Sequence, residues 1–228
     1  GSFPNHIPNP ENETAMQSIL DAVQESKADL GIIFDTDVDR AGAVLSDGTE
    51  LNRNRIIAMM AAILLREHPG TTIVTDSITS TGLAAFIRKH GGVHHRFKRG
   101  YRNVINESMR LNRGGHDSQL AMETSGHGAL KENYFLDDGA YLVTRLLIEL
   151  ARAKKEGYTL ESLIADLAEP AESKEFRMNI LVPDFKAYGQ KIIDELNVYA
   201  ASQPGWSVAP DNFEGVRVNL DKAHGDGW

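Results

Sequence analysis

The sequence predicts an α/β fold in which mixed or parallel sheets are flanked by helices. Short apolar runs rich in β-branched residues alternate with longer segments whose apolar residues recur at helical spacing, and turn residues separate them. The chain has 228 residues, of which 41% are hydrophobic, and it has no cysteine. It is long enough for one or two domains with a self-sufficient core. The absence of cysteine excludes disulfides, thiolate zinc sites and a cysteine nucleophile.

Each element is predicted from its local pattern. The first helix begins near Asn12 or Thr14, either of which can cap it, and carries Ile19, Leu20 and Val23 on one face. Further helices are predicted at 52–67, 82–90, 103–111, after 139, at 159–167 and at 184–200. Strands are predicted at 30–34, 41–45, 71–75, 93–97, 119–123, 176–182 and 216–220, and a linker at 168–173.

The charge balance and the hydropathy limit the partners. The 24 basic and 32 acidic side chains give a net charge of −8, which repels nucleic acid and anionic membranes. No apolar run reaches the roughly 20 residues of a membrane span, and residues 1–4 lack the features of a signal peptide. We therefore expect a cytoplasmic protein that binds neither nucleic acid nor membranes.

The loop at 35–40 carries the strongest chemical signal. Asp35, Asp37 and Asp39 directly follow an apolar strand, at the strand end where α/β sheets usually bind ligands. Carboxylates this close repel one another, so at least one has a raised pKa unless a cation neutralises them. Oxygen ligands suit Mg²⁺ or Ca²⁺, and Arg40 beside them can hold a phosphate through its forked guanidinium.

Other kinds of protein also use acidic loops. An EF-hand would need glycine where Arg40 stands and glutamate where Ser46 stands, so that interpretation is excluded. A haloacid-dehalogenase-like phosphatase would use Asp35 as nucleophile and Asp37 as acid, with residues 137–138 as a later magnesium pair. This alternative stays open, as does a module that binds a metal and a sugar phosphate without catalysis.

The residues of this loop and of a second one resemble those of a known family. Asp-Thr-Asp-Val-Asp-Arg at 35–40 resembles the magnesium loop, D-G-D-G-D-R, of the α-D-phosphohexomutase family, which includes phosphomannomutase and phosphoglucomutase. Thr36 and Val38 replace the two glycines of that pattern. Met-Glu-Thr-Ser-Gly-His at 122–127 resembles the family's sugar-binding loop, G-E-x-S-G-H. Further resemblance is found at 3–11, 137–139 and 215–218, so it extends over nearly the whole chain.

The resemblance implies a four-domain enzyme that interconverts hexose 1-phosphate and hexose 6-phosphate through a phosphoserine and a bisphosphate intermediate. The chain would hold the end of the second domain at 1–50, one complete phosphohexomutase-type third domain at 51–170, and the start of the fourth at 171–228. The implied cofactors are Mg²⁺ and a hexose 1,6-bisphosphate activator. The implied ligand is a hexose phosphate, and we expect a monomer or a weak dimer.

In the first loop, the resemblance implies that Asp35, Asp37 and Asp39 bind Mg²⁺. Arg40 would be catalytic, either contacting the phosphoryl group or steering the proton-transfer residue. The family's phosphoserine loop, T-x-S-H-N-P-like, is absent from this sequence, and residues 79–81 do not match it because they lack the His-Asn-Pro tail. The family's phosphate clamp, R-x-S-x-T-x-P-like, is also absent. We therefore expect that the chain alone does not turn over.

In the second loop, the resemblance implies that Glu123 and Ser125 bind sugar hydroxyls. His127 would be a general acid/base or a sugar contact. A lysine and a histidine that family members often carry upstream of this loop are replaced here by Ile78, or a neighbour, and by Tyr101.

A basic cluster surrounds the second of these replaced positions, directly after a predicted strand. Lys98, Arg99 and Arg102 either supply the missing charge as substrate-binding residues or form an exposed loop with incidental charge, and both interpretations stay open. The pair His94-His95 is predicted to be solvated rather than to bind a metal, because no third ligand stands nearby in the sequence.

Overall fold

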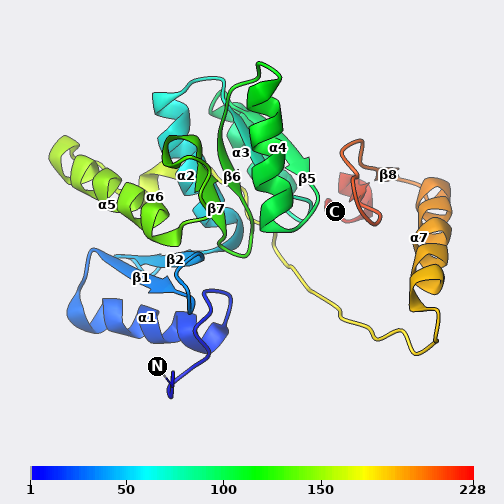
Figure 1. Ribbon diagram of the computed structural model, residues 1–228, viewed down its shortest axis with the longest axis horizontal. Coiled ribbons are helices and arrows are strands. Elements are labelled where there is room, and N and C mark those ends of the chain that lie inside the picture. The colour runs from blue at the N-terminus through cyan, green and yellow to red at the C-terminus, as the bar shows by residue number, and fades with distance from the viewer. Residues whose placement is uncertain (1) are drawn as a thin grey trace. The chain divides into compact units, whose positions relative to one another are not determined.

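The computed structural model describes residues 2–228, and the chain divides into two compact units, Gly1–Ala168 and Glu169–Trp228 (Figure 1). The predicted α/β class with mixed sheets is confirmed. The first unit contains both of the loops singled out from the sequence.

The N-terminal part of the first unit is an antiparallel sheet covered by a helix. The sheet has the order β1 (Leu30–Phe34), β2 (Ala41–Leu45), β3 (Glu50–Leu51). The helix α1 (Glu13–Ser26) lies along β1 and β2 (Figure 1). Asn12 caps this helix as predicted, because its side chain accepts a hydrogen bond from the Ala15 backbone N–H at 3.0 Å.

Strand β2 connects the two halves of the first unit, because its alternate side chains enter different cores. Val44 packs with the apolar face of α1, whereas Ala43 and Leu45 belong to the larger core around the second helix. Every residue of β2 is buried. The loop that leads into β2 is therefore fixed from both sides.

The second sheet has the order β5-β4-β6-β7, in which β4 is parallel to β5 and β6, and β7 is antiparallel to β6. Its strands are β4 (Thr72–Asp76), β5 (Val93–Phe97), β6 (Ser118–Met122) and β7 (Gly128–Leu130). Its helices are α2 (Arg53–Glu67), α3 (Thr81–Lys89), α4 (Tyr101–Arg113) and α5 (Gly139–Glu156). Side chains of α2, α3 and α5 pack on one face of the sheet, and those of α4 on the other.

Helix α2 lies at the centre of the larger core. Its residues 56–65 are all buried, so the helix is enclosed on every side rather than on a single face. Met59 and Met60 have no exposed surface, which suits an unbranched side chain that fills irregular gaps.

Several sequence predictions of secondary structure are wrong. The segment 176–182 forms no strand, and its apolar side chains are exposed, Leu181 to 92%. A strand needs a neighbour to pair with, and within residues 2–228 the segment has none. The helix predicted at 159–167 is limited to α6 (Leu160–Leu163), and the short strands β3 and β7 were not predicted.

The second unit consists of one long helix and a hairpin. Helix α7 (Phe185–Ser202) is followed by β8 (Trp206–Val208), which pairs antiparallel with β9 (Val218–Leu220). The helix matches its prediction closely, the second strand is shorter than predicted, and β8 was not predicted. Within residues 2–228, no helix has both the length and the apolar composition that a membrane span requires.

Candidate functional site

The acidic loop joins β1 to β2, and its first carboxylate is fixed by its last residue. Arg40 donates to Asp35 from its side-chain Nε at 2.7 Å and from its backbone N–H at 3.2 Å. Burial alone would raise the pKa of Asp35, but the hydrogen bonds and the charge of Arg40 outweigh it and lower that pKa. Asp35 is therefore held as a carboxylate that points into the loop.

The three aspartates form a group that could hold a hard cation. One carboxylate oxygen from each of Asp35, Asp37 and Asp39 lies within 4.8 Å of the others. Burial raises the pKa of Asp39, and the charges of Asp35 and Asp37 add to this effect, which agrees with the repulsion expected from the sequence. Asp39 Oδ1 is buried and has no hydrogen-bond partner among residues 2–228. An all-oxygen set with an unpaired buried oxygen fits Mg²⁺.

The backbone of this loop is strained at Val38, whose φ is +68°. A β-branched residue rarely adopts this left-handed conformation, and glycine adopts it freely. The conformation brings the Val38 carbonyl to the start of α5, where it accepts a hydrogen bond from the Gly139 backbone N–H at 3.0 Å. The loop thus keeps a shape that suits glycine although it carries valine.

The second loop, residues 122–127, connects β6 to β7 in a tight turn. The Glu123 backbone N–H donates to the His127 carbonyl at 2.9 Å, and the Glu123 side chain is buried. Its Oε1 accepts from the Gly100 backbone N–H at 2.6 Å, and its Oε2 lies 3.5 Å from Ser125 Oγ. Burial raises the pKa of Glu123, and the Gly100 hydrogen bond and nearby positive charge only partly oppose it.

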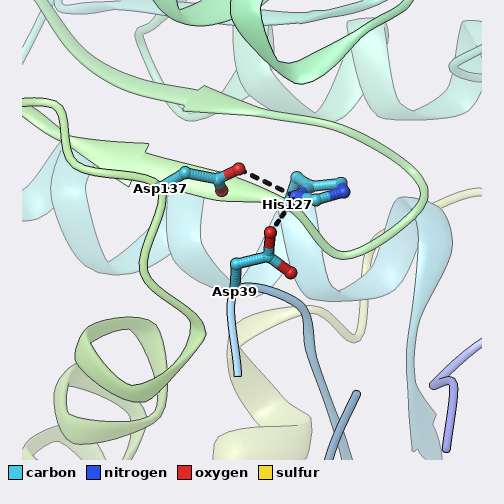
Figure 2. A group of neighbouring side chains, drawn as sticks. All are labelled: Asp39, His127 and Asp137. Atoms are coloured by element: carbon cyan, nitrogen blue, oxygen red, sulfur yellow. Dashed lines mark hydrogen bonds and ion pairs between the residues drawn. The ribbon is translucent and has the colours of Figure 1, made fainter. Parts of the chain in front are cut away.

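His127 lies between two carboxylates from different elements (Figure 2). Its Nδ1 is 2.8 Å from Asp137 Oδ2 and 3.7 Å from Asp39 Oδ2, and its ring stacks on Tyr101 with centroids 5.0 Å apart. Burial lowers the pKa of His127, but the Asp137 hydrogen bond and the charges of Asp137, Asp39 and Glu123 raise it by more, so the pKa is above its usual 6.5. The imidazole is therefore positioned to carry a proton near neutral pH.

The two loops are in direct contact. Arg40 and His127 form an isolated antiparallel bridge, and the Ala41 backbone N–H donates to the Gly126 carbonyl at 3.3 Å. A Cβ on Gly126 would lie 2.9 Å from the Ala41 carbonyl oxygen, and its φ is +99°, so this close approach requires glycine. The predicted metal and sugar loops therefore form one continuous surface.

The basic cluster is exposed on the turn between β5 and α4 and on the first turn of α4, which carries Arg102. Lys98, Arg99 and Arg102 are all exposed, and Arg102 Nε donates to the Tyr101 hydroxyl at 3.1 Å. The positive charge of Arg99 lowers the pKa of Glu123 and so partly offsets the rise that burial causes. Because Tyr101 stacks on His127, the turn carrying these charges lies beside the second loop. Ile78, in contrast, is simply exposed.

The phosphatase alternative has little support in this geometry. The Asp35 side chain is 1% exposed and paired with Arg40, so its oxygens are not free to attack a phosphate. Asp137 accepts hydrogen bonds from the Gly128 backbone N–H and pairs with His127, whereas Asp138 caps α5 through the Tyr141 backbone N–H. Residues 137–138 therefore do not form an open magnesium pair.

Some functional contacts were not expected from the sequence. Asp137 as the partner of His127 is one, and Asp76, which accepts from Thr124 at the back of the second loop, is another. The signal for Asp76 is an aspartate directly after a β-branched run, as at Asp35. The pair His94-His95 is partly buried rather than solvated: His94 Nε2 lies 2.8 Å from Thr75 Oγ1, and His95 Nε2 lies 2.9 Å from Glu107.

Comparison with known families and proteins gives a consistent result. Residues 52–170 match the model of phosphoglucomutase/phosphomannomutase alpha/beta/alpha domain III, and residues 1–48 match that of alpha/beta/alpha domain II. The chain is 30% identical over 226 residues to a phosphoglucomutase of Neisseria meningitidis, covering 99% of this chain and 46% of that protein. It is 31% identical over 227 residues to a phosphomannomutase/phosphoglucomutase of Pseudomonas aeruginosa, with the same coverage.

Among solved structures, a phosphoglucomutase/phosphomannomutase family protein from Burkholderia thailandensis superposes with a TM-score of 0.77 at 30% identity. The match covers 96% of this chain and 43% of that one. A putative phosphomannomutase from Thermus thermophilus shares the fold, with a TM-score of 0.57 at 19% identity over 70% of this chain and 35% of that one. The chain thus spans about half the length of the curated relatives it matches.

Proposed function

The chain belongs to the phosphoglucomutase/phosphomannomutase family, and from this membership we propose that it supplies the metal-binding and sugar-binding loops of a phosphohexomutase. The whole enzyme interconverts hexose 1-phosphate and hexose 6-phosphate through a phosphoserine and a bisphosphate intermediate, and a hexose 1,6-bisphosphate activates it. The observation that carries the proposal is the contact between the two loops at Arg40 and His127. A phosphoryl group beside the first loop is then within reach of a sugar held by the second.

In this proposal Mg²⁺ is held by Asp35, Asp37 and Asp39, whose oxygens fit a hard cation. Bound there, it would neutralise the charge that builds up on the transferring phosphoryl oxygens. Arg40 keeps Asp35 ionised and oriented, and its guanidinium would contact the phosphoryl group. The charges of Lys98 and Arg102 would attract the phosphate of the substrate.

Sugar hydroxyls would be bound by Glu123 and Ser125, whose oxygens lie side by side. A hexose turned over still presents neighbouring hydroxyls to the same pair, which suits a reaction that uses both ends of the sugar. Asp137 holds Nδ1 of His127, which leaves Nε2 to exchange a proton with the substrate. His127 is therefore the proposed general acid/base.

The domain assignment is part of the proposal. Residues 1–50 are assigned to the second domain, 51–170 to the third and 171–228 to the fourth, with the family matches at 1–48 and 52–170 in support. The phosphoserine loop is absent from this sequence, so the chain alone binds ligands without turnover. A monomer or weak dimer and a cytoplasmic location remain predictions.

Calorimetry on this chain tests the two binding functions separately. Asp37→Asn is expected to weaken Mg²⁺ binding at least about tenfold, and Glu123→Gln to weaken glucose 1-phosphate binding similarly, because each removes a charged ligand. The matched controls are Asp21→Asn and Glu25→Gln on the exposed surface of α1, which should change neither affinity. If wild type binds neither Mg²⁺ nor glucose 1-phosphate, the proposal is wrong.

Activity assays separate the remaining alternatives. Hydrolysis of a simple phosphate ester by this chain, lost in Asp35→Asn, would establish the phosphatase instead. Robust interconversion of glucose 1-phosphate and glucose 6-phosphate by the chain alone, with a bisphosphate activator, would contradict the expectation that further residues are needed.

A further inference from the structure

Asp76 is a buried carboxyl group that the proposed function does not use. It ends β4, at the same edge of the sheet as the second loop, and it is 1% exposed. Its Oδ2 accepts a hydrogen bond from Thr124 Oγ1 at 2.7 Å. Its Oδ1 is also buried and has no hydrogen-bond partner among residues 2–228. Burying a carboxyl group with one oxygen unpaired is unfavourable for folding, so the residue calls for another explanation.

The hydrogen-bond partner of Asp76 is Thr124 of the second loop. Thr124 is buried, and it stands between Glu123 and Ser125, the two residues proposed to bind the sugar. Its hydroxyl donates to Asp76 at 2.7 Å. A buried side chain held in this way limits the freedom of the residues on either side.

The other contacts of the second loop include those with the acidic loop at residues 126–127 and with the turn before α4 at Glu123, and none of these joins it to β4. The Glu123 side chain accepts from the Gly100 backbone N–H, and Ser125 Oγ lies 3.5 Å from Glu123 Oε2. Thr124 therefore provides the connection between this part of the loop and β4, the neighbouring parallel strand.

We propose that Asp76 is a positioning residue: by holding Thr124 it sets where Glu123 and Ser125 present their oxygens to the hexose. The inference rests on the proposed sugar-binding function of the second loop. Asp76 makes no contact with the substrate and acts only through Thr124.

The electrostatics of the site support this role. The pKa of Asp76 is raised to about 6, because burial, together with the charge of Glu123, outweighs the lowering by the Thr124 hydrogen bond and by Arg99. Asp76 is thus ionised near neutral pH, where a charged acceptor binds the Thr124 hydroxyl more strongly than a neutral one. The ionised Asp76 therefore lowers the stability of the fold but holds Thr124 of the second loop more firmly, as we expect of a positioning residue.

The test removes either end of the hydrogen bond and follows the loop directly. In Asp76→Ala and Thr124→Val, amide hydrogen exchange in residues 123–127 is expected to become about tenfold faster, and glucose 1-phosphate binding about tenfold weaker, because each variant loses a bond to a charged group. The double variant should be no worse than either single one, since both remove the same bond. Thr124→Ser keeps the hydroxyl and should behave as wild type.

Thr79→Val is the matched control. Thr79 is a buried threonine just after β4 whose hydroxyl bonds to Thr75 and to the Asp76 carbonyl, so its loss loosens the same region without touching the second loop. It should leave the exchange of residues 123–127 unchanged. If Asp76→Ala does not fold, comparison of Thr124→Val with Thr124→Ser still decides whether Asp76 positions the second loop.

Two failures are distinguishable. If wild type does not bind glucose 1-phosphate, the proposed function fails, while the exchange measurements still decide whether Asp76 orders the loop. If wild type binds the sugar phosphate, and Thr124→Val changes neither loop exchange nor affinity, the positioning role is wrong. Equal effects of Thr79→Val and Thr124→Val on the loop would also overturn it, because they would reveal general loosening.

Discussion

The ionisation of Asp76 should make the stability of this protein fall as the pH rises. The pKa of Asp76 is raised by burial from 3.8 to about 6 in the folded chain, whereas in the unfolded chain it returns to its ordinary value. Between these two values the folded state keeps a proton that the unfolded state has released. Raising the pH through this window therefore favours unfolding, which is opposite to the usual effect of a salt-bridged aspartate.

The size of the effect follows from the two pKa values. The difference between 3.8 and about 6, at about 1.4 kcal/mol for each pH unit, is about 3 kcal/mol of stability lost across the window. Asp76→Asn removes the titration and can keep the Thr124 hydrogen bond through its amide oxygen. Relative to wild type, this variant should therefore gain about 3 kcal/mol in unfolding free energy between the acid and the alkaline end of the window.

Urea unfolding followed by circular dichroism over this pH range measures the difference. Trp206 and Trp228 are the two tryptophans of the chain and lie in the second unit, so tryptophan fluorescence reports separately on residues 169–228. Asp117→Asn is a control of opposite sign: hydrogen bonds from Thr71, Lys131 and Gln119 outweigh burial and lower the pKa of Asp117, so its stabilisation is lost as the pH falls. Identical pH profiles for wild type and Asp76→Asn would refute the reasoning.

Three further predictions concern the two loops. Val38→Gly should raise the unfolding free energy measured in urea by roughly 0.5–1 kcal/mol, because it relieves the left-handed strain by more than glycine loses in entropy; an unchanged value would show that valine is unstrained there. Gly139→Ala should destabilise the chain by about 2 kcal/mol and weaken Mg²⁺ binding in calorimetry, because the new Cβ would lie 2.8 Å from the Val38 carbonyl oxygen and 3.0 Å from the Arg40 carbonyl carbon. His127 should titrate above 6.5 when followed by NMR, and its charge should stabilise the fold only below this raised pKa. Asp137→Asn should lower the pKa of His127, and an unaltered titration would contradict the pairing of His127 with Asp137.

The sequence predicted those elements whose pattern is local. Helix α1 has its cap and its apolar face within one short segment, and β1 and β2 are short apolar runs bounded by turn residues. The segment 176–182 is also a largely apolar run but forms no strand, because pairing depends on a neighbour that no local pattern reveals. The short strand β7 is held by β6 rather than by its own three residues.

The candidate site was predictable to the extent that its residues are consecutive. The sequence reveals the metal-binding candidates Asp35, Asp37 and Asp39 because all three lie in one loop. The contact of Asp137 with His127 is also short in sequence, yet it depends on β7 turning back along β6. Asp76 and Thr124 are 48 residues apart and meet only because β4 and β6 are neighbours in the sheet.

The acidic groups of the candidate site bear on how an acidic chain would bind the proposed anionic substrate. Asp39, Asp76 and Glu123 all have a raised pKa, with burial the largest cause, and each also feels the negative charge of a neighbouring carboxylate. Such repulsion makes a cation bound at the first loop doubly favourable, since it gains ligands and relieves the like charges. If the phosphate binds before the cation, the carboxylates repel it. If the cation is already bound, the phosphate is attracted by the cation and by the basic cluster. Because coupling between two ligands is reciprocal, a hexose phosphate that binds better in the presence of Mg²⁺ must also tighten Mg²⁺ binding. The net charge of −8 therefore opposes the proposed substrate only while the first loop lacks its metal.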